Sequence, residues 1–117
     1  MKLLQDNETI SVDELKLMSE KMFESLVKAV VDIEKKIMIV DAEMYADQEE
    51  VLLEQGSEQC NLWGINLHPD FFGTDEFIEF DSMINIRSSQ GNRSRSVENV
   101  ATQKSIRSLV DKFVKKS

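Results

Sequence analysis

The chain has 117 residues, of which 41% are hydrophobic and 31% are charged, with one proline and four glycines. This length predicts a single domain over residues 1–117, and this composition is typical of a folded chain and excludes disorder as the default. The 22 acidic residues outnumber the 14 basic ones and give a net charge of −8. Such a charge disfavours a uniformly basic surface that wraps nucleic acid.

Apolar runs in the chain are short. The longest covers residues 37–40, far below the roughly 20 apolar residues that a membrane helix needs. Residues 1–6 already include an acidic residue, Asp6, and lack the apolar centre of a signal peptide. Cys60 is the only cysteine, and its neighbours provide neither a base nor a positive charge to activate it. We therefore expect a cytoplasmic protein with no membrane contact and no cofactor.

The first third of the chain predicts a helix followed by a β-hairpin. Ser11 and Glu14 have the spacing of a capping box, and the apolar residues after them recur at helical intervals, which favours a helix over 12–25. Residues 27–33 are rich in β-branched side chains, and an apolar segment follows a short polar turn. These two segments predict a hairpin whose second strand covers 37–45.

The middle of the chain predicts a short helix and a second hairpin. Asp47 and Glu50 repeat the capping spacing, and Gly56 stands where a C′ glycine ends a helix, so we expect a helix over 48–55. The segments 62–67 and 76–86 both alternate between apolar and polar residues, with turn residues between them. This alternation predicts two antiparallel strands.

A C-terminal amphipathic helix completes the order. Its apolar positions follow the i, i+3, i+4, i+7 pattern: Ile106, Leu109, Val110, Phe113 and Val114. The order α-ββ-α-ββ-α favours an α+β two-layer sandwich, with an antiparallel sheet of about four strands and helices packed on one face. The predicted core is Leu15, Met22, Phe23, Val31, Ile39, Leu52, Trp63, Ile65, Ile84, Leu109 and Phe113.

Charge is unevenly distributed along the chain. Residues 1–58 carry fifteen acids and six bases, residues 59–86 five acids and no base, and residues 87–117 two acids and eight bases. The C-terminal quarter is therefore basic on an otherwise acidic chain. Two interpretations are open: this quarter attracts an external anion, or its bases meet the chain's own carboxylates in weak surface pairs.

Five segments together resemble a small prokaryotic family of conserved hypothetical proteins, a domain of unknown function. They are 27–34, 52–57, 62–66 with the string Trp-Gly-Ile-Asn, 79–87, and 90–95 with the string Gln-Gly-Asn-Arg-Ser-Arg. The resemblance covers nearly the whole chain. It implies a standalone cytoplasmic domain and brings with it no catalytic residue, cofactor or partner.

The loop after the predicted fourth strand is the first candidate site. Guanidinium groups match phosphate or carboxylate with paired donors, hydroxyl and amide groups add hydrogen bonds, and glycine lets backbone N–H groups come close to a ligand. The residues concerned are Arg87, Ser89, Gln90, Gly91, Asn92, Arg93, Ser94 and Arg95. We predict a non-enzymatic module that binds a phosphate-bearing small molecule, nucleic acid, an acidic protein or a second copy of the chain. A solvated loop that binds the protein's own carboxylates is the alternative.

Carboxylates on the predicted strands form the second candidate site. Asp32, Glu34, Glu43 and Asp81 could hold a divalent cation that activates water, as in a metal-dependent hydrolase or nuclease. Alternating acids on an exposed sheet face are also ordinary solubilising residues. His68 stands alone without an evident nucleophile, so the sequence leaves open whether the protein is an enzyme.

Overall fold

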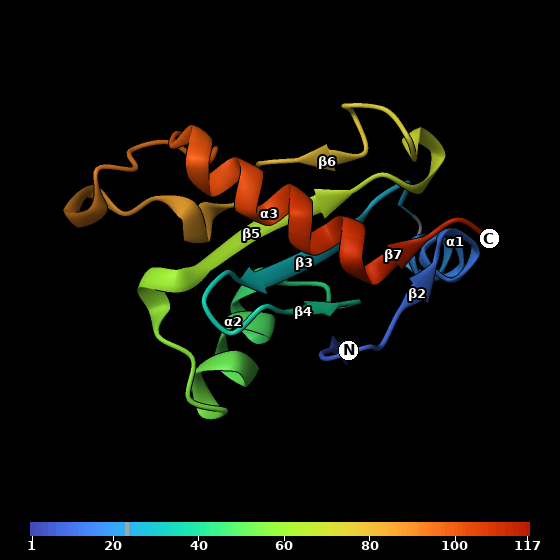
Figure 1. Cartoon of the computed structure of the whole chain (residues 1–117), viewed down its shortest axis with the longest axis horizontal. Helices are drawn as coiled ribbons and strands as arrows, with labels where there is room; N and C mark the ends of the chain where they lie inside the picture. The colour runs from blue at the N-terminus through green and yellow to red at the C-terminus, as the bar shows by residue number, and fades with distance from the viewer. Residues whose placement is uncertain (23) are drawn as a thin grey trace.

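A five-stranded antiparallel sheet forms the centre of the computed structural model, which describes residues 1–22 and 24–117. Its order is β1-β4-β3-β5-β6, with β1 at Lys2–Leu4, β3 at Val27–Asp32, β4 at Ile37–Val40, β5 at Leu62–Leu67 and β6 at Ile78–Glu79. The α-helices among the described residues are α1 (Val12–Lys21), α2 (Tyr45–Glu54) and α3 (Val100–Phe113). Strands β2 (Ile10–Ser11) and β7 (Val114–Lys115) pair in parallel beside α1 (Figure 1). The predicted α+β class is confirmed.

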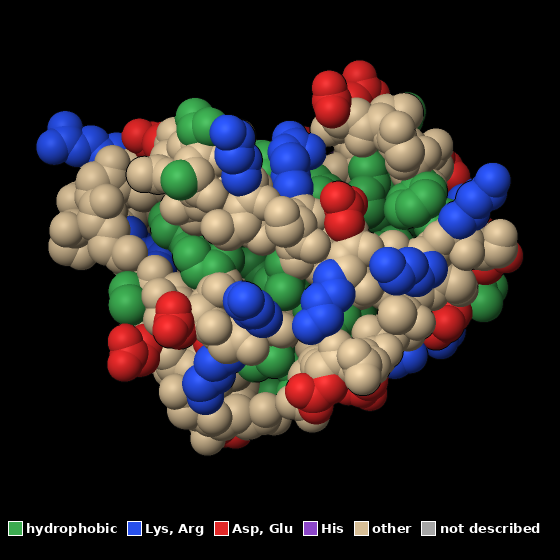
Figure 2. All heavy atoms as spheres, in the orientation of Figure 1, with side chains coloured by type: hydrophobic (Ala, Val, Ile, Leu, Met, Phe, Trp, Pro, Cys, Tyr) green, Lys and Arg blue, Asp and Glu red, His purple; other side chains and the backbone are tan. Residues whose placement is uncertain are grey.

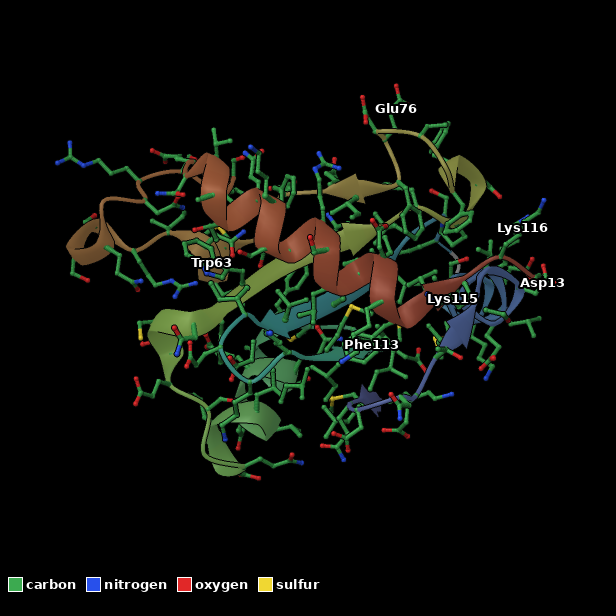
Figure 3. All side chains as sticks on the ribbon, in the orientation of Figure 1. Asp13, Trp63, Glu76, Phe113, Lys115 and Lys116 are labelled. Carbon is green, nitrogen blue, oxygen red and sulfur yellow. The ribbon has the colours of Figure 1, made fainter. Side chains whose placement is uncertain are left out.

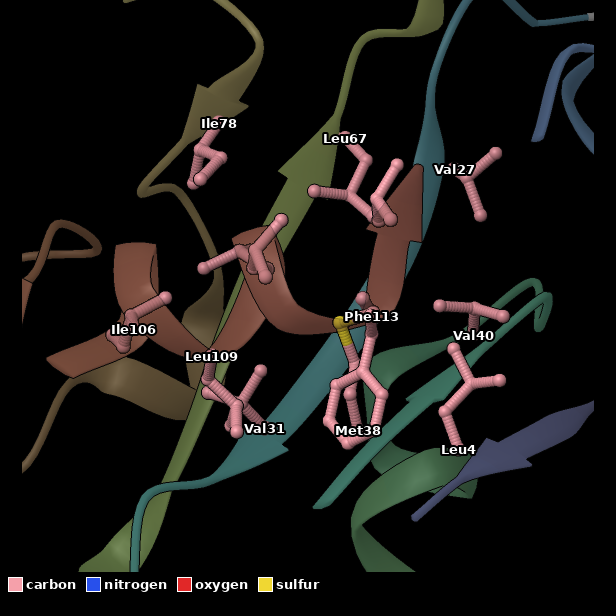
Figure 4. Close-up of a cluster of buried hydrophobic side chains, with 14 of the residues drawn as sticks. Leu4, Val27, Val31, Met38, Val40, Leu67, Ile78, Ile106, Leu109 and Phe113 are labelled. Atoms are coloured by element: carbon pink, nitrogen blue, oxygen red, sulfur yellow. The ribbon is translucent and has the colours of Figure 1, made fainter. Parts of the chain in front are cut away.

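Alternation along the strands divides the buried side chains between the two faces of the sheet. Val27, Ala29 and Val31 of β3 lie in the larger apolar cluster, whereas Val30 lies in the smaller one. Helices α1 and α3 both cover the larger cluster, as predicted, and Figure 4 shows side chains of α3 meeting those of the strands there. The helix residues in this cluster are Val12, Leu15, Ile106, Leu109, Val110 and Phe113.

Helix α2 packs on the opposite face, so the helices are not all on one side of the sheet as the sequence suggested. Its Leu52 belongs to the smaller cluster together with Val30 and Ile39. The physical reason lies in the central strands, where all four residues of Ile37–Val40 are buried. A strand that is apolar on both faces needs cover on both faces.

The start of α1 and the end of α2 match the sequence pattern closely. The predicted capping box begins α1, with Glu14 N–H donating to Ser11 Oγ at 3.1 Å. Gly56 ends α2 with a φ of 91°, and the N–H of Ser57 donates to the carbonyl of Leu52 at 3.0 Å. This is the C′ glycine of a Schellman motif, and both predictions are confirmed.

Other boundaries differ from the prediction. Strand β4 ends at Val40 because Asp41 adopts a φ of 70°, which turns the chain out of the sheet. Helix α2 consequently begins at Tyr45, with Met44 as its N-cap, so the predicted cap at Asp47 is wrong. Helix α1 ends at Lys21, earlier than predicted.

The second predicted hairpin is much shorter than its alternating pattern suggested. Of the predicted strand 76–86, only Ile78 and Glu79 pair with β5. Met83–Asn85 forms a 3-10 turn instead, begun by Ser82, whose hydroxyl accepts the N–H of Ile84 at 3.4 Å. A local bond from a serine side chain competes here with the strand conformation.

The side chain of Asn85 takes the place of a further strand beside β5. Its Oδ1 accepts the N–H of Gly64 at 2.8 Å, and its Nδ2 donates to the carbonyl of Gly64 at 2.9 Å. The approach requires glycine, because a Cβ at this position would lie 2.6 Å from Cβ of Ser82. The buried backbone groups of Gly64 are thus satisfied on the side of β5 away from β3, where no described strand pairs with this residue.

Most of the predicted core is buried. Eight of its members are buried, namely Leu15, Val31, Ile39, Leu52, Trp63, Ile65, Leu109 and Phe113. Met22 and Ile84 are only partly buried, and Phe23 lies outside the described residues. Strand β1 was not predicted, yet it places the fully buried Leu4 in the larger cluster.

Candidate functional site

The guanidinium of Arg87 is bound by the protein's own backbone. Its Nη1 donates to the carbonyl of Gln59 at 2.6 Å and to Oε1 of Gln90 at 3.2 Å, and its Nη2 donates to the carbonyl of Leu62. The group also stacks on Trp63, with Cζ 4.1 Å from the ring centroid. Burial lowers the pKa of Arg87. These contacts attach the start of the predicted loop to β5 and use both terminal nitrogens of Arg87.

Asn92 is a buried residue that organises the rest of the loop. Its Nδ2 donates to the carbonyls of Asn85, Ser94 and Ser96 at 2.8, 3.1 and 2.7 Å. Gly91 precedes it with a φ of 78° in the left-handed region, a conformation that glycine adopts without strain. Its Oδ1 accepts the N–H of Glu98 at 2.9 Å. Asn92 therefore has a structural role, because backbone groups bind both ends of its amide.

The carboxylate of Glu98 accepts hydrogen bonds from donors of the loop that we predicted to bind an external anion. Its Oε2 accepts the N–H of Arg93 at 2.9 Å, the N–H of Ser94 at 2.8 Å and the hydroxyl of Ser94 at 2.8 Å. The hydrogen bond from the Ser94 hydroxyl, followed by the two backbone bonds, lowers the pKa of Glu98. These backbone and hydroxyl donors of the loop are thus occupied by one of the protein's own carboxylates.

The remaining loop residues differ in their engagement. Arg95 Nε lies 2.6 Å from Oδ1 of Asp81, in an ion pair whose side chains are both partly exposed. Within the described part of the chain, the guanidinium of Arg93 has no carboxylate within 4.0 Å and the hydroxyl of Ser89 forms no hydrogen bond. The anion-binding loop stays a prediction, with Arg93 as the side chain that is still available.

The four predicted metal-binding carboxylates do not form one site. Asp32 Oδ1 accepts the N–H groups of Glu34 and Lys35, each at 2.9 Å, and so shapes the turn between β3 and β4. Glu43 precedes α2, and Asp81 pairs with the loop beyond β6. Among the residues that the structure describes, no three His, Cys, Asp or Glu side chains are grouped to hold a metal ion. The hydrolase alternative therefore has no assembled set of ligands here.

A groove along α3, which sequence reasoning missed, gathers basic side chains from two distant segments. Its volume is about 440 Å³, and we call it the lysine groove. It is lined by Ile33, Lys36, Lys104, Ser105, Ser108, Leu109 and Lys112. Lys104, Ser108 and Lys112 lie four residues apart on one side of α3. Lys36 comes from the turn between β3 and β4.

The electrostatics of the lysine groove differ from those of the whole chain. In the described residues, none of its three lysines has a carboxylate oxygen within 4.0 Å. Figure 2 shows Lys and Arg side chains over and around α3, with most acidic side chains toward the edges of this face. A second hollow of about 410 Å³ adjoins the groove and shares Lys36 and Lys112 with it. The basic C-terminal quarter was the sequence signal for this face.

A hydrogen-bonded set of polar side chains joins α2 to β5 and β6. The Tyr45 hydroxyl donates to Oδ1 of Asn66, and Nδ2 of Asn66 donates to Oε1 of Glu79 at 2.7 Å. The same Glu79 oxygen lies 3.2 Å from Nε2 of His68. Burial, reinforced by the charge of Asp81, raises the pKa of Tyr45 to about 12. The hydrogen bond from Asn66 lowers the pKa of Glu79. The sequence pattern did not indicate this set, because it depends on the pairing of Asn66 with Glu79 across β5 and β6.

The fold and these surfaces define a small α+β protein with an antiparallel sheet covered on both faces and a basic groove along its last helix. The family model described as a protein of unknown function (DUF5674) matches residues 4–113, and the chain belongs to this family. The resemblance inferred from the sequence strings to a domain-of-unknown-function family is thereby confirmed. No curated protein and no solved structure matches the chain. None of the described helices has the length and apolar character needed to cross a bilayer.

Proposed function

We propose that the protein is a non-enzymatic cytoplasmic binding module whose lysine groove holds a phosphate-bearing small molecule. One observation carries the proposal. Lys36, Lys104 and Lys112 line a single groove without a carboxylate within 4.0 Å in the described residues, on a chain whose net charge is −8. Lysines that merely solubilise an acidic protein would gain from facing its abundant carboxylates.

The other lining residues favour a small ligand with both phosphate and apolar parts. Ser105 and Ser108 add hydroxyl donors between the lysines, and Ile33 and Leu109 provide apolar surface. A volume of about 440 Å³ lies within the range of small-molecule sites. Lysine ammonium groups bind phosphate as point charges with several donors. A nucleotide-sized phosphate ester fits these properties.

The test is calorimetric titration with tripolyphosphate and ATP, with adenosine as the uncharged comparison. The K36Q/K104Q/K112Q variant should bind both phosphate probes about tenfold more weakly or worse, because three charge-assisted contacts are lost. The control K16Q/K21Q/K116Q changes the net charge equally at lysines outside the groove, and its affinity should stay within about twofold, because exposed charges at a distance are screened by salt.

Several outcomes would contradict this function. Equal losses in the groove and control variants would mean that only overall charge matters. Tighter binding of a single-stranded DNA oligomer or of polyglutamate than of ATP would assign the groove to a macromolecule instead. An R93A/R95A variant that loses as much affinity as the groove variant would move the site to the loop. In that case, changing both arginines to lysine should weaken binding less than changing them to alanine.

A further inference from the structure

A pocket separate from the lysine groove opens beside β6. Its volume is about 320 Å³, and its lining residues are His68, Phe71, Glu76, Ile78 and Glu79. We call it the β6 pocket. Two of its members, Phe71 and Ile78, provide apolar walls, and the Phe71 side chain is 46% exposed. An exposed aromatic ring beside carboxylates is an arrangement that favours a cationic ligand.

Glu79 is held in place by a buried partner. Asn66, only 5% exposed, donates to Oε1 of Glu79 at 2.7 Å, and the amide of Asn66 is itself fixed by the Tyr45 hydroxyl. His68 approaches the same oxygen at 3.2 Å. The other carboxylate oxygen, Oε2, forms no hydrogen bond in the described part of the chain. One oxygen of Glu79 is thus used for positioning and the other is left for a ligand.

The described lining of the β6 pocket contains two carboxylates and no lysine or arginine. The segment 59–86, which supplies all of its lining residues, holds five acids and no lysine or arginine. No lysine or arginine nitrogen lies within 4.0 Å of Glu76 or Glu79 in the described residues. Figure 3 shows Glu76 at the outer edge of its loop, projecting from the molecule. Glu79, whose side chain is 48% exposed, is the carboxylate held by Asn66, and Glu76 contributes to the field at the rim.

We propose that the β6 pocket binds a primary ammonium group carried on a short apolar body. The ammonium group donates to Oε2 of Glu79, and the methylene groups lie against Phe71 and Ile78. A ring face and a carboxylate both attract a cation, and a neutral or anionic ligand of the same shape gains neither contact. This site does not depend on the lysine groove, whose charge is opposite.

The test uses n-butylammonium as the probe, with 1-butanol and butyrate as neutral and anionic analogues of similar size. Amide shifts in two-dimensional NMR should move at Ile78 and Glu79 with saturation for butylammonium, and both analogues should bind at least about tenfold more weakly. In E79Q the affinity for butylammonium should fall about tenfold, since glutamine keeps the oxygen that accepts from Asn66 and removes the charge. E50Q, at an exposed position on α2, should leave the affinity unchanged.

Two smaller effects sharpen the test. E76Q should weaken butylammonium about twofold, because a rim charge acts through solvent. F71A removes a half-exposed ring, and it should weaken the binding of butylammonium about threefold with an unchanged melting temperature. If E79Q fails to fold, F71A replaces it as the deciding variant. Equal affinity for 1-butanol, or no effect of either deciding variant, would overturn the proposal.

One further arm distinguishes the sources of the ammonium group. Cadaverine represents a free amine, and a glycine-flanked lysine peptide represents a lysine side chain of a protein. Tighter binding of cadaverine assigns the pocket to a small amine, and tighter binding of the peptide assigns it to a protein partner. If neither shifts the pocket amides, the ammonium site itself is refuted, whatever the calorimetry at the lysine groove has shown.

Discussion

The two faces of the sheet are stabilised by different means. The α3 face buries the larger apolar cluster, which includes the fully buried Phe113 and Met38. The α2 face has a smaller apolar cluster, and beside it buried amides pair with backbone groups. Gln48 of α2 donates to the carbonyl of Lys28 at 2.8 Å, and Asn85 pairs with Gly64 at the side of β5. Burial of apolar area is tolerant of detail, whereas buried hydrogen bonds require particular atoms at particular distances. We infer that the α3 face supplies most of the stability and that the α2 face supplies specificity of structure.

The largest effect is expected on the α3 face. Phe113→Ala should lower the free energy of unfolding by about 3–5 kcal/mol, because it removes buried apolar area and leaves a cavity. Chemical denaturation monitored by circular dichroism measures this change. Met83→Ala serves as the control, since Met83 is an exposed hydrophobic residue and its loss should stay within about 0.5 kcal/mol. Similar values for the two variants would show that Phe113 does not lie in the main core.

A smaller effect is expected from the buried amide of Asn85 beside β5. Asn85→Ala should cost about 1–3 kcal/mol, because the N–H and carbonyl groups of Gly64 lose their partner in a buried place. Amide hydrogen exchange at Gly64 should quicken in the same variant. The control is Asn7→Ala at an exposed position, which should change neither quantity. Unaltered exchange at Gly64 would contradict the role assigned to Asn85.

The smallest effect concerns Tyr45, the only tyrosine in the chain, which makes its titration directly visible in the near-ultraviolet spectrum. The native protein should show a pKa of about 12, against an ordinary value of 10.0, which the denatured chain should return to. A pKa raised on folding means that the native state retains the proton. The stabilisation is therefore complete below about pH 10 and is lost as the pH rises towards 12. Tyr45→Phe should show a shallower loss of stability over that interval. Equal native and denatured midpoints would place the hydroxyl in solvent.

Local sequence signals determined the elements whose stabilising contacts lie close together in the chain. The capping box of Ser11 and Glu14, the C′ position of Gly56 and the apolar stripe of α3 each depend on residues within about two turns of helix. The strands β3, β4 and β5 were recognisable from their β-branched residues and alternating pattern, because these signals also lie within short segments of the chain. The α+β class followed from the order of these elements.

Only the tertiary structure decided the features that join distant segments. The parallel pairing of β2 with β7, the side chosen by α2 and the bonds from Asn85 to Gly64 depend on contacts far apart in sequence. The same holds for both candidate sites. Lys36 meets Lys104 and Lys112 because α3 lies beside the turn between β3 and β4, and Asn66 meets Glu79 because β5 and β6 pair in one register. Periodicity reports which face a residue occupies within its own element, but the residue opposite it is set by packing of the whole chain.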